Sequence, residues 1–103
     1  MKAYLITPAS QSVDVVDVSG LDDIIDLIGY NTIEADAIDE NRTRLYFDEE
    51  CLIRGDAVIG RFQLDSLIPV AGLAVVAGAG EDAEDICDVK VDLDELRGRV
   101  KFL

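Results

Sequence analysis

The sequence has no histidine, no tryptophan and only two cysteines among its 103 residues. The absence of histidine removes the commonest general base and the commonest metal ligand in proteins. The two cysteines, Cys51 and Cys87, are too few for a disulfide framework and lack the spacing of metal ligands. We therefore expect two free, buried thiols in a reducing compartment, with a single bridge between them as the alternative.

Basic residues are also scarce, and long apolar runs are missing. Nine Lys and Arg oppose 22 Asp and Glu, which gives a formal net charge of −13. Because phosphate contacts need Lys and Arg, this balance argues against direct binding to nucleic acid or to an anionic membrane. The apolar residues before Thr7 are too few for a signal peptide, and no stretch approaches a membrane span. A cytoplasmic location is the simplest prediction.

Hydrophobic residues, by contrast, make up half of the chain. This fraction separates it from disordered acidic chains, which are poor in apolar residues. A chain of 103 residues is too short for two independent domains. We expect residues 1–103 to form one domain with an acidic exterior.

The acids are unevenly distributed along the chain. Nine of them, and no Lys or Arg, lie between Ala3 and Asn41. The eight acids after Ser66 all fall between Glu81 and Glu95. The acidity is therefore predicted to belong to particular surfaces.

Two strands are predicted at the start of the chain. Residues 2–7 are apolar on both alternating faces, which is typical of a central strand, and Pro8-Ala9-Ser10 turns the chain. Residues 13–18 also alternate, but the pattern slips at Val15-Val16, which predicts a β-bulge. The short connection favours an antiparallel hairpin.

An amphipathic helix is predicted after this hairpin. Its apolar stripe has the spacing i, i+3, i+4, i+7 and consists of Leu21, Ile24, Ile25 and Ile28. Ser19 is the expected N-cap, with Asp22 in the acidic position of a capping box, and Gly29 suits a left-handed C-terminal stop. We expect all four apolar side chains to anchor the helix to a sheet.

Two further strands, over residues 33–37 and 44–47, are predicted to pair with each other. Pairing Ala35 with Leu45 aligns their apolar faces and places Asp36 across from Arg44. A shift of two residues keeps the same faces together and is the alternative register. The connecting loop covers residues 38–42.

The second half of the chain combines irregular and strongly apolar segments. Glycines and a proline interrupt residues 48–72, although four apolar side chains there are expected to pack: Phe62, Leu64, Leu67 and Ile68. We expect a buried strand over residues 73–77, a turn over 78–84, a returning strand over 86–91 and a short helix over 92–97.

The predicted fold class is α+β. It comprises a mainly antiparallel sheet covered by one principal short helix, with a short C-terminal helix. The order of hairpin, helix and hairpin at the start of the chain also allows a β-grasp-like arrangement.

Two sequence motifs have simpler explanations than a ligand. Gly78-Ala79-Gly80-Glu81-Asp82-Ala83 matches the dinucleotide-binding pattern G-x-G-x-x-A. However, its acids place negative charge where a pyrophosphate would lie, and a strand rather than a helix follows. Arg54-Gly55-Asp56 spells an integrin-binding tripeptide, but without a secretion signal we interpret it as a turn.

Clusters of acidic residues are the remaining candidates for a site. They lack the spacing of a calcium-binding loop, so we predict no metal site. No histidine, reactive cysteine or nucleophile motif supports catalysis, so we predict no catalytic residues, no cofactor and no enzymatic activity. The predicted acidic interaction surface comprises Asp22, Asp23, Asp26, Asp48, Glu49, Glu50, Glu81, Asp82, Glu84 and Asp85.

Several short motifs occur in a familiar order. They are Met1-Lys2-Ala3 with Leu5-Ile6 and Pro8, Leu27-Ile28-Gly29, Tyr46-Phe47-Asp48-Glu49-Glu50 with Leu52-Ile53 and Gly55, Pro69-Val70-Ala71-Gly72 with Ala74-Val75-Val76 and Gly78, and Asp88-Val89. The series spans nearly the whole chain and resembles a family of small domains of unknown function from bacterial, plasmid and phage genomes. Cys51 departs from it, since a small residue, often glycine, stands there in the family. The resemblance implies a mobile-element origin and an accessory, non-enzymatic role, with no assigned site residues.

The first functional hypothesis is an intracellular domain without catalytic activity that binds a protein partner or a second copy of itself. Uncharged apolar segments at residues 67–71 and 73–77 favour a homodimer, which should loosen at low salt because both copies are acidic. The alternative is an acidic DNA mimic that inhibits a nucleic-acid-binding enzyme of a restriction or other defence system. Acidity that serves only solubility or a saline habitat, and a small or metal-dependent enzyme, are the remaining classes.

Overall fold

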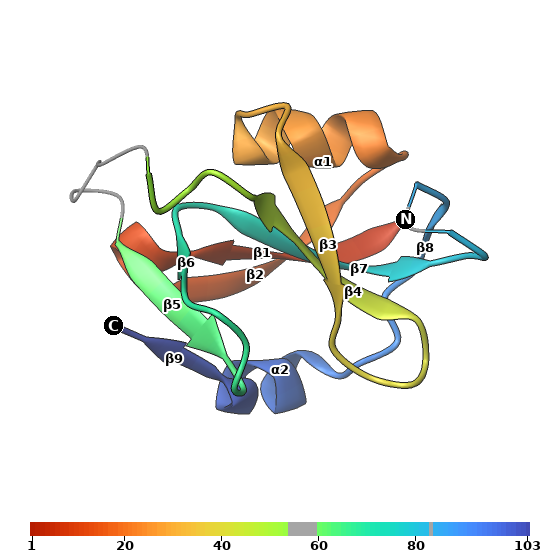
Figure 1. The fold of residues 1–103 in the computed structure, drawn as a ribbon. Helices are drawn as coiled ribbons and strands as arrows, with labels where there is room; N and C mark the ends of the chain where they lie inside the picture. The colour runs from red at the N-terminus through yellow and green to blue at the C-terminus, as the bar shows by residue number, and fades with distance from the viewer. Residues whose placement is uncertain (54–59, 83) are drawn as a thin grey trace.

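Three layers make up the molecule in the computed structural model, which describes residues 1–53, 60–82 and 84–103. A helix, α1 (Leu21–Ile28), covers one face of a six-stranded sheet. A three-stranded sheet and a second helix, α2 (Leu93–Arg99), cover the opposite face (Figure 1). The predicted α+β class is confirmed, and so is the packing of the principal helix on a sheet.

The main sheet places an uncharged strand at its centre. In chain order its strands are β1 (Lys2–Thr7), β2 (Ser12–Asp17), β3 (Ile33–Ala37), β4 (Thr43–Asp48), β7 (Ala74–Ala79) and β8 (Ile86–Cys87). Their spatial order is β2-β1-β7-β4-β3, with β8 paired to β7, and every pairing among the described residues is antiparallel. β7 lies between β1 and β4 and is buried along its whole length, which confirms the predicted buried strand.

The second sheet consists of short strands that the sequence pattern does not predict. Its order is β6 (Val70–Ala71), β5 (Arg61–Leu64) and β9 (Val100–Phe102). Helix α2 precedes β9 and begins after Asp92, whose side chain accepts a hydrogen bond from the Asp94 N–H at 3.1 Å. A 3₁₀ turn, η1 (Pro8–Ser10), joins β1 to β2 at the predicted place.

Because both faces of the main sheet are covered, each inner strand contributes to two cores. Val75 and Ala77 of β7 belong to the core under α1, whereas Ala74 and Val76 belong to the core on the other face. The core under α1 also contains Ala3, Val18, Ile24, Ile28, Tyr46 and Ile86. The opposite core includes Tyr4, Ile6, Leu45, Phe62, Leu64 and Leu96. Burial of this apolar surface holds the layers together.

Helix α1 begins and ends close to its predicted bounds, but its start differs in detail. The N-cap is Gly20 rather than Ser19, and no side chain caps the helix. Ser19 instead donates hydrogen bonds from its N–H and its Oγ to one carboxylate oxygen of Asp23, each at 2.7 Å. Gly29 ends the helix with a φ of 90°, as predicted.

The apolar stripe of α1 is centred on Ile24 rather than on Ile25. Ile24 and Ile28 are buried, and Leu21 and Leu27 are partly buried beside them. Ile25 is also partly buried, but it lines the groove beside β3 and is not among the side chains packed against this core. The expectation that Ile25 anchors the helix is therefore wrong, because Leu27 takes the fourth place in the stripe.

The predicted register between β3 and β4 is wrong by one residue. Ala35 pairs with Tyr46 and Asp36 with Leu45, so Asp36 does not lie across from Arg44. Both faces of β4 are apolar because both are covered, so the alternation of its side chains does not select the register. The loop over residues 38–42 is as predicted.

Other local expectations are also corrected. The bulge predicted at Val15-Val16 is wrong, because β1 and β2 pair without a break and Val15 is exposed on an edge strand. Ile68 is 76% exposed rather than packed in a core. Both cysteines are free, but only Cys51 is buried, since Cys87 lies exposed on the short strand β8.

Two sequence features need separate mention. The Arg54-Gly55-Asp56 motif lies outside the described residues, so its interpretation as a turn stays a prediction. Within the described parts of the chain, neither helix combines the length and the apolar character that crossing a membrane requires.

Candidate interaction surface

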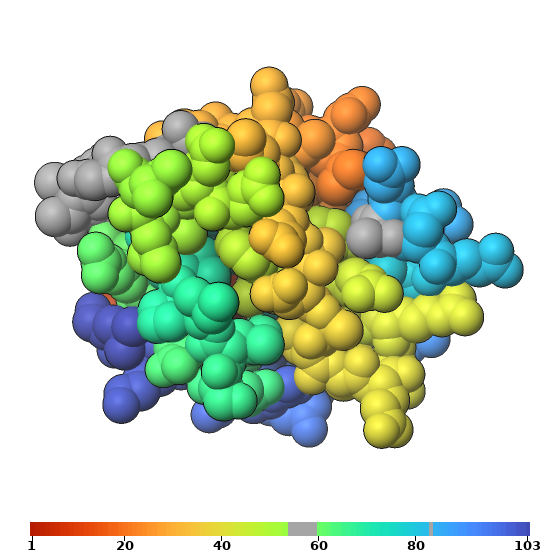
Figure 2. All heavy atoms as spheres, in the orientation of Figure 1, coloured from red at the N-terminus to blue at the C-terminus, as the bar shows by residue number. Residues whose placement is uncertain are grey.

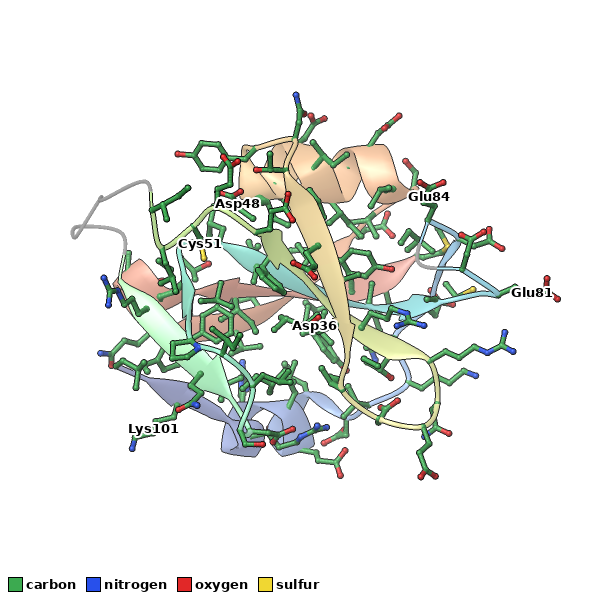
Figure 3. All side chains as sticks on the ribbon, viewed as in Figure 1. Asp36, Asp48, Cys51, Glu81, Glu84 and Lys101 are labelled. Atoms are coloured by element: carbon green, nitrogen blue, oxygen red, sulfur yellow. The ribbon has the colours of Figure 1, made fainter. Side chains whose placement is uncertain are left out.

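The ten predicted acidic residues do not gather on one surface. Three lie on α1, three follow one another at the end of β4, and four lie in the turn between β7 and β8. Figure 3 shows that Glu81 points outward at the tip of that turn, whereas Glu84 lies near the N-terminal end of α1. The acids of α1 and Glu84 therefore share one side of the molecule, and Glu81 points away from it.

Asp48 is a structural residue rather than part of an exposed acidic surface. Its side chain is only 3% exposed. The hydroxyl of Thr32 donates a hydrogen bond to the carboxylate, and the Glu50 N–H donates another at 3.1 Å. A buried carboxylate with these partners fixes the end of β4. Its inclusion in the acidic surface was wrong, and no pattern of charge along the sequence distinguishes it from Glu49.

The glycines of the β7–β8 turn have a structural explanation. A Cβ at Gly78 would lie 2.4 Å from the backbone oxygen of Asp88, and one at Gly80 would lie 2.7 Å from the Asp85 carboxylate. The Gly80 N–H donates to the Asp85 carbonyl at 2.6 Å, and the strand β8 follows. The turn predicted in place of a dinucleotide-binding loop is thus present, and close packing against the backbone of Asp88 requires glycine at position 78.

A groove lies between α1 and the edge strand β3. We call it the α1–β3 groove; its volume is about 380 Å³, and its walls include Leu21, Ile25, Ile33, Ala35, Tyr46 and Glu84. Five of these six side chains are predominantly apolar, Glu84 supplies a carboxylate, and Asn31 adds a polar amide group to the lining. Burial, with a smaller contribution from the charge of Asp82, raises the pKa of the Tyr46 phenol to about 12.

A second groove lies on the other flank of α1, against β2. It is lined by Val16, Asp17, Asp23, Asp26 and Leu27. The hydrogen bonds from Ser19 lower the pKa of the Asp23 carboxyl, so that carboxylate is ionised well below neutral pH. Acidic side chains therefore border both flanks of α1.

Four of the eight described Lys and Arg residues lie on the opposite side of the main sheet. Arg97 and Arg99 belong to α2, and Arg61 and Lys101 belong to the second sheet. The α1 side has acids over residues 18–31 and no Lys or Arg there. Two described positive charges act on this side: the N-terminal ammonium, which lies against Asp17 and affects Asp23, and Arg44 of β4, whose charge acts on the Tyr46 phenol. The domain is therefore electrically polar, with α1 on the acidic side.

The outer edge of β3, which we call the β3 edge, is open to solvent among the described residues. The Ile38 N–H donates to the Thr43 carbonyl, and the Glu49 N–H donates to the Thr32 carbonyl. In a strand the direction of the backbone groups alternates, so even-numbered residues between these two bonds face β4. The N–H and C=O groups of Ala35 and Ala37 therefore point outward, and β3 has no second neighbour in the described sheet.

Neither the groove nor the β3 edge follows from the sequence pattern alone. Which backbone groups of β3 face outward depends on the register with β4, and the predicted register was wrong. The groove depends on the position of α1 over the sheet, which brings Glu84 beside Leu21 from a distant part of the chain. The usable signal in the sequence is the small size of Ala35 and Ala37 in a strand without Lys or Pro.

Comparisons with known proteins add no relative, because no family model, no curated protein and no solved structure matches the chain. The resemblance to a family of bacterial, plasmid and phage domains stays a prediction. Among the described residues, no three acidic or thiol side chains are grouped so that they could hold a metal ion.

Proposed function

We propose that this protein is a cytoplasmic, non-catalytic domain that binds a partner protein through its α1 side. The observation that carries the proposal is the electrical polarity of the domain. Carboxylates border both flanks of α1, which has no Lys or Arg of its own, whereas α2 and the second sheet carry four of the eight described Lys and Arg. A partner with a basic surface is attracted to the α1 side and oriented by it.

The walls of the α1–β3 groove supply the second element of a binding surface. Charge complementarity contributes mainly to the rate of association and to specificity, whereas burial of apolar surface supplies most of the affinity. Ile25 and Leu21 are accessible in this groove and are flanked by the Glu84 carboxylate. This combination suits a partner that has both basic and apolar side chains.

The DNA-mimic hypothesis receives less support from this arrangement. A mimic needs carboxylates in one strip with the spacing of phosphates. Asp48 is buried, and Glu81 and Glu84 point in different directions (Figure 3). The net charge of −13 is the observation that keeps mimicry as a second candidate.

The proposal is tested by two variants that remove equal charge from opposite sides of the main sheet. In the first, Asp22→Asn and Asp26→Asn neutralise two exposed carboxylates of α1. In the second, Asp94→Asn and Glu95→Gln neutralise two exposed carboxylates of α2. Each protein is immobilised and exposed to a lysate of the source cells, and the retained proteins are identified by mass spectrometry.

We expect wild type and the α2 variant to retain the same partner, and the α1 variant to lose it. Retention by all three proteins would contradict binding through the α1 side. If the retained protein is a DNA-binding enzyme that the wild type inhibits, and duplex DNA displaces it, DNA mimicry replaces the proposal.

A further inference from the structure

We propose that the β3 edge binds an extended segment of a partner protein as an additional strand, and that apolar and basic residues alternate along this segment. The inference deepens the proposed function, on which it rests, by naming how the partner binds. It follows from three features of β3: its outward backbone groups, the groove beside it and the two acids on its other face.

The outward backbone groups provide the hydrogen bonds. Ala35 and Ala37 direct their N–H and C=O groups away from β4, as the bonds of Ile38 and Glu49 on either side show. A strand added to a sheet edge gains affinity from such main-chain bonds. In Figure 2 the residues of β3 run down the front of the molecule, and no other segment covers them. The small alanine side chains leave room for another backbone.

The α1–β3 groove provides places for alternate side chains of the added strand. Ile33, Ala35 and Ala37 share the face of β3 that is directed toward α1, since Ala35 pairs with Tyr46 of the core under α1. Residues of an added strand that point to the same face extend over the groove beside Ile25 and Leu21. Apolar side chains at these alternate positions bury surface that is otherwise exposed.

The other face of β3 selects the intervening residues by charge. Glu34 and Asp36 point to this face, and neither has a hydrogen-bond or ion-pair partner among the described residues. Lys or Arg directly opposite a carboxylate on a neighbouring strand is stabilising, whereas a like charge is destabilising. A second copy of β3 would place its own Glu34 and Asp36 near these acids, so charge disfavours self-pairing and favours a basic partner segment.

The test uses synthetic nonapeptides and ¹⁵N-labelled full-length protein. One peptide alternates Lys and Val, a second has the same composition with the lysines and valines in separate blocks, and a third alternates Glu and Val. Binding is followed by amide chemical shifts and by hydrogen exchange. We expect saturable binding of the alternating Lys–Val peptide, at least about tenfold tighter than the block peptide, with new protection at Ala35 and Ala37.

A pair of proline variants separates the β3 edge from the other edge of the sheet. Ala37→Pro removes an outward N–H of β3, and Val15→Pro removes an outward N–H of β2, so neither breaks a bond inside the sheet. We expect Ala37→Pro to weaken binding of the Lys–Val peptide by at least about tenfold, because a strand bond is lost and the ring obstructs the edge. Val15→Pro should change binding by less than about twofold.

A charge-reversed variant tests binding at the β3 edge if the proline variant does not fold. Glu34→Lys with Asp36→Lys should weaken binding of the Lys–Val peptide by about fivefold and should strengthen binding of the Glu–Val peptide.

Three results would overturn strand addition. The first is equal binding of the block and alternating peptides, which would show that charge alone suffices. The second is unchanged binding in both the Ala37→Pro and the charge-reversed variants. The third is a dimer of wild type that Ala37→Pro abolishes, which would make a second copy the occupant. Loss of the cellular partner in the Asp22→Asn, Asp26→Asn variant, with retention in the β3 variants, would leave the proposed function intact while removing this mechanism.

Discussion

The two edges of the main sheet differ in what occupies their outward backbone groups. At the β2 edge, the Arg97 guanidinium of α2 donates two hydrogen bonds to the Val13 carbonyl, from Nε at 3.2 Å and from Nη2 at 2.8 Å. At the β3 edge, the corresponding groups of Ala35 and Ala37 have no partner among the described residues. The chain itself therefore occupies one backbone acceptor of the β2 edge, whereas the outward groups of Ala35 and Ala37 are open.

This difference indicates which backbone groups at the edges of the main sheet are covered and which are accessible to a partner. Unpaired strand edges are prone to association, and proteins block them with charge, bulges or covering segments. The charges on β3 leave its backbone accessible to a strand of complementary charge, whereas Arg97 occupies a backbone group of β2 directly. Arg97 covers part of the β2 edge, and no side chain of the described residues covers Ala35 and Ala37 of β3 in the same way.

The largest expected effect on stability comes from disrupting the packing of α1, the helix beside the β3 edge, on the main sheet. Ile24→Asp places a carboxylate at a fully buried position under α1 and should lower the free energy of unfolding by about 3–5 kcal/mol. Ile25→Asp is the matched control at a partly buried position outside the core and should cost about 1 kcal/mol or less. Urea denaturation followed by circular dichroism measures both values. Equal losses would contradict the placement of the helical stripe.

Opening the β2 edge should have a smaller effect. Arg97→Met keeps much of the aliphatic stem but removes both donors to the Val13 carbonyl, and should lower stability by about 1–2 kcal/mol. The variant should also associate at lower concentration than wild type, because a backbone acceptor of β2 becomes free. Urea denaturation and sedimentation velocity test the two expectations. Arg61→Met on β5 is the control, and association in both variants alike would count against a role of Arg97 at the edge.

Lowering the pH should remove the stabilising contribution of an ion pair near the end of β3. Arg99 donates to the Ile38 carbonyl at 2.7 Å and pairs with Asp65. The hydrogen bond from Arg99 lowers the pKa of the Asp65 carboxyl, so the pair stabilises the fold above the unfolded value of about 4 and this contribution is lost as pH falls through the lowered pKa. Asp65 is 39% exposed, so solvent screening limits the contribution to about 0.5–1 kcal/mol.

The measurement is the stability difference between wild type and Asp65→Asn at several pH values. It should be constant from about pH 6 to 8 and should shrink below about pH 4. Asp94→Asn, which alters a longer ion pair at a carboxylate that is 90% exposed, should show little difference at any pH. A difference for Asp65→Asn that grows in acid would have the wrong sign for this interpretation.

The smallest expected effect is on self-association of the wild-type chain. A homodimer at moderate salt should loosen as salt falls, because each copy carries −13 and screening weakens at low ionic strength. If the β3 edge binds a basic partner rather than a second copy, Ala37→Pro should leave the monomer–dimer equilibrium unchanged. Sedimentation equilibrium at two salt concentrations provides the test. A monomer under both conditions would contradict the dimer and leave both edges without a second copy.

The elements of the fold were predictable where a sequence pattern is compatible with only one type of secondary structure. The uncharged apolar run that becomes β7 and the stop at Gly29 identify their elements directly. The register of β3 on β4 was not predictable, because Leu45 and Tyr46 are both buried on opposite faces of one strand. Strands β6 and β9 are too short for an alternating pattern, and their pairing with β5 depends on distant parts of the chain.

The candidate site was predictable in its charge but not in its geometry. The excess of acids in the first part of the chain predicts acidic surfaces, and the structure places three of these acids on α1. The burial of Asp48 depends on Thr32, which lies 16 residues earlier and is brought to it by the β3–β4 pairing. The open β3 edge depends on which direction each backbone group takes, and this is a property of the register rather than of composition.

The central position of β7 has a consequence for the order of folding. The β1–β2 and β3–β4 hairpins join neighbours in the sequence, but β7 must enter between β1 and β4 from about 70 residues beyond β1. Until it arrives, the inner edges of both hairpins are unsatisfied. The rate-limiting step should therefore be the insertion of this strand, and a chain still in synthesis presents two aggregation-prone edges that the finished protein never shows.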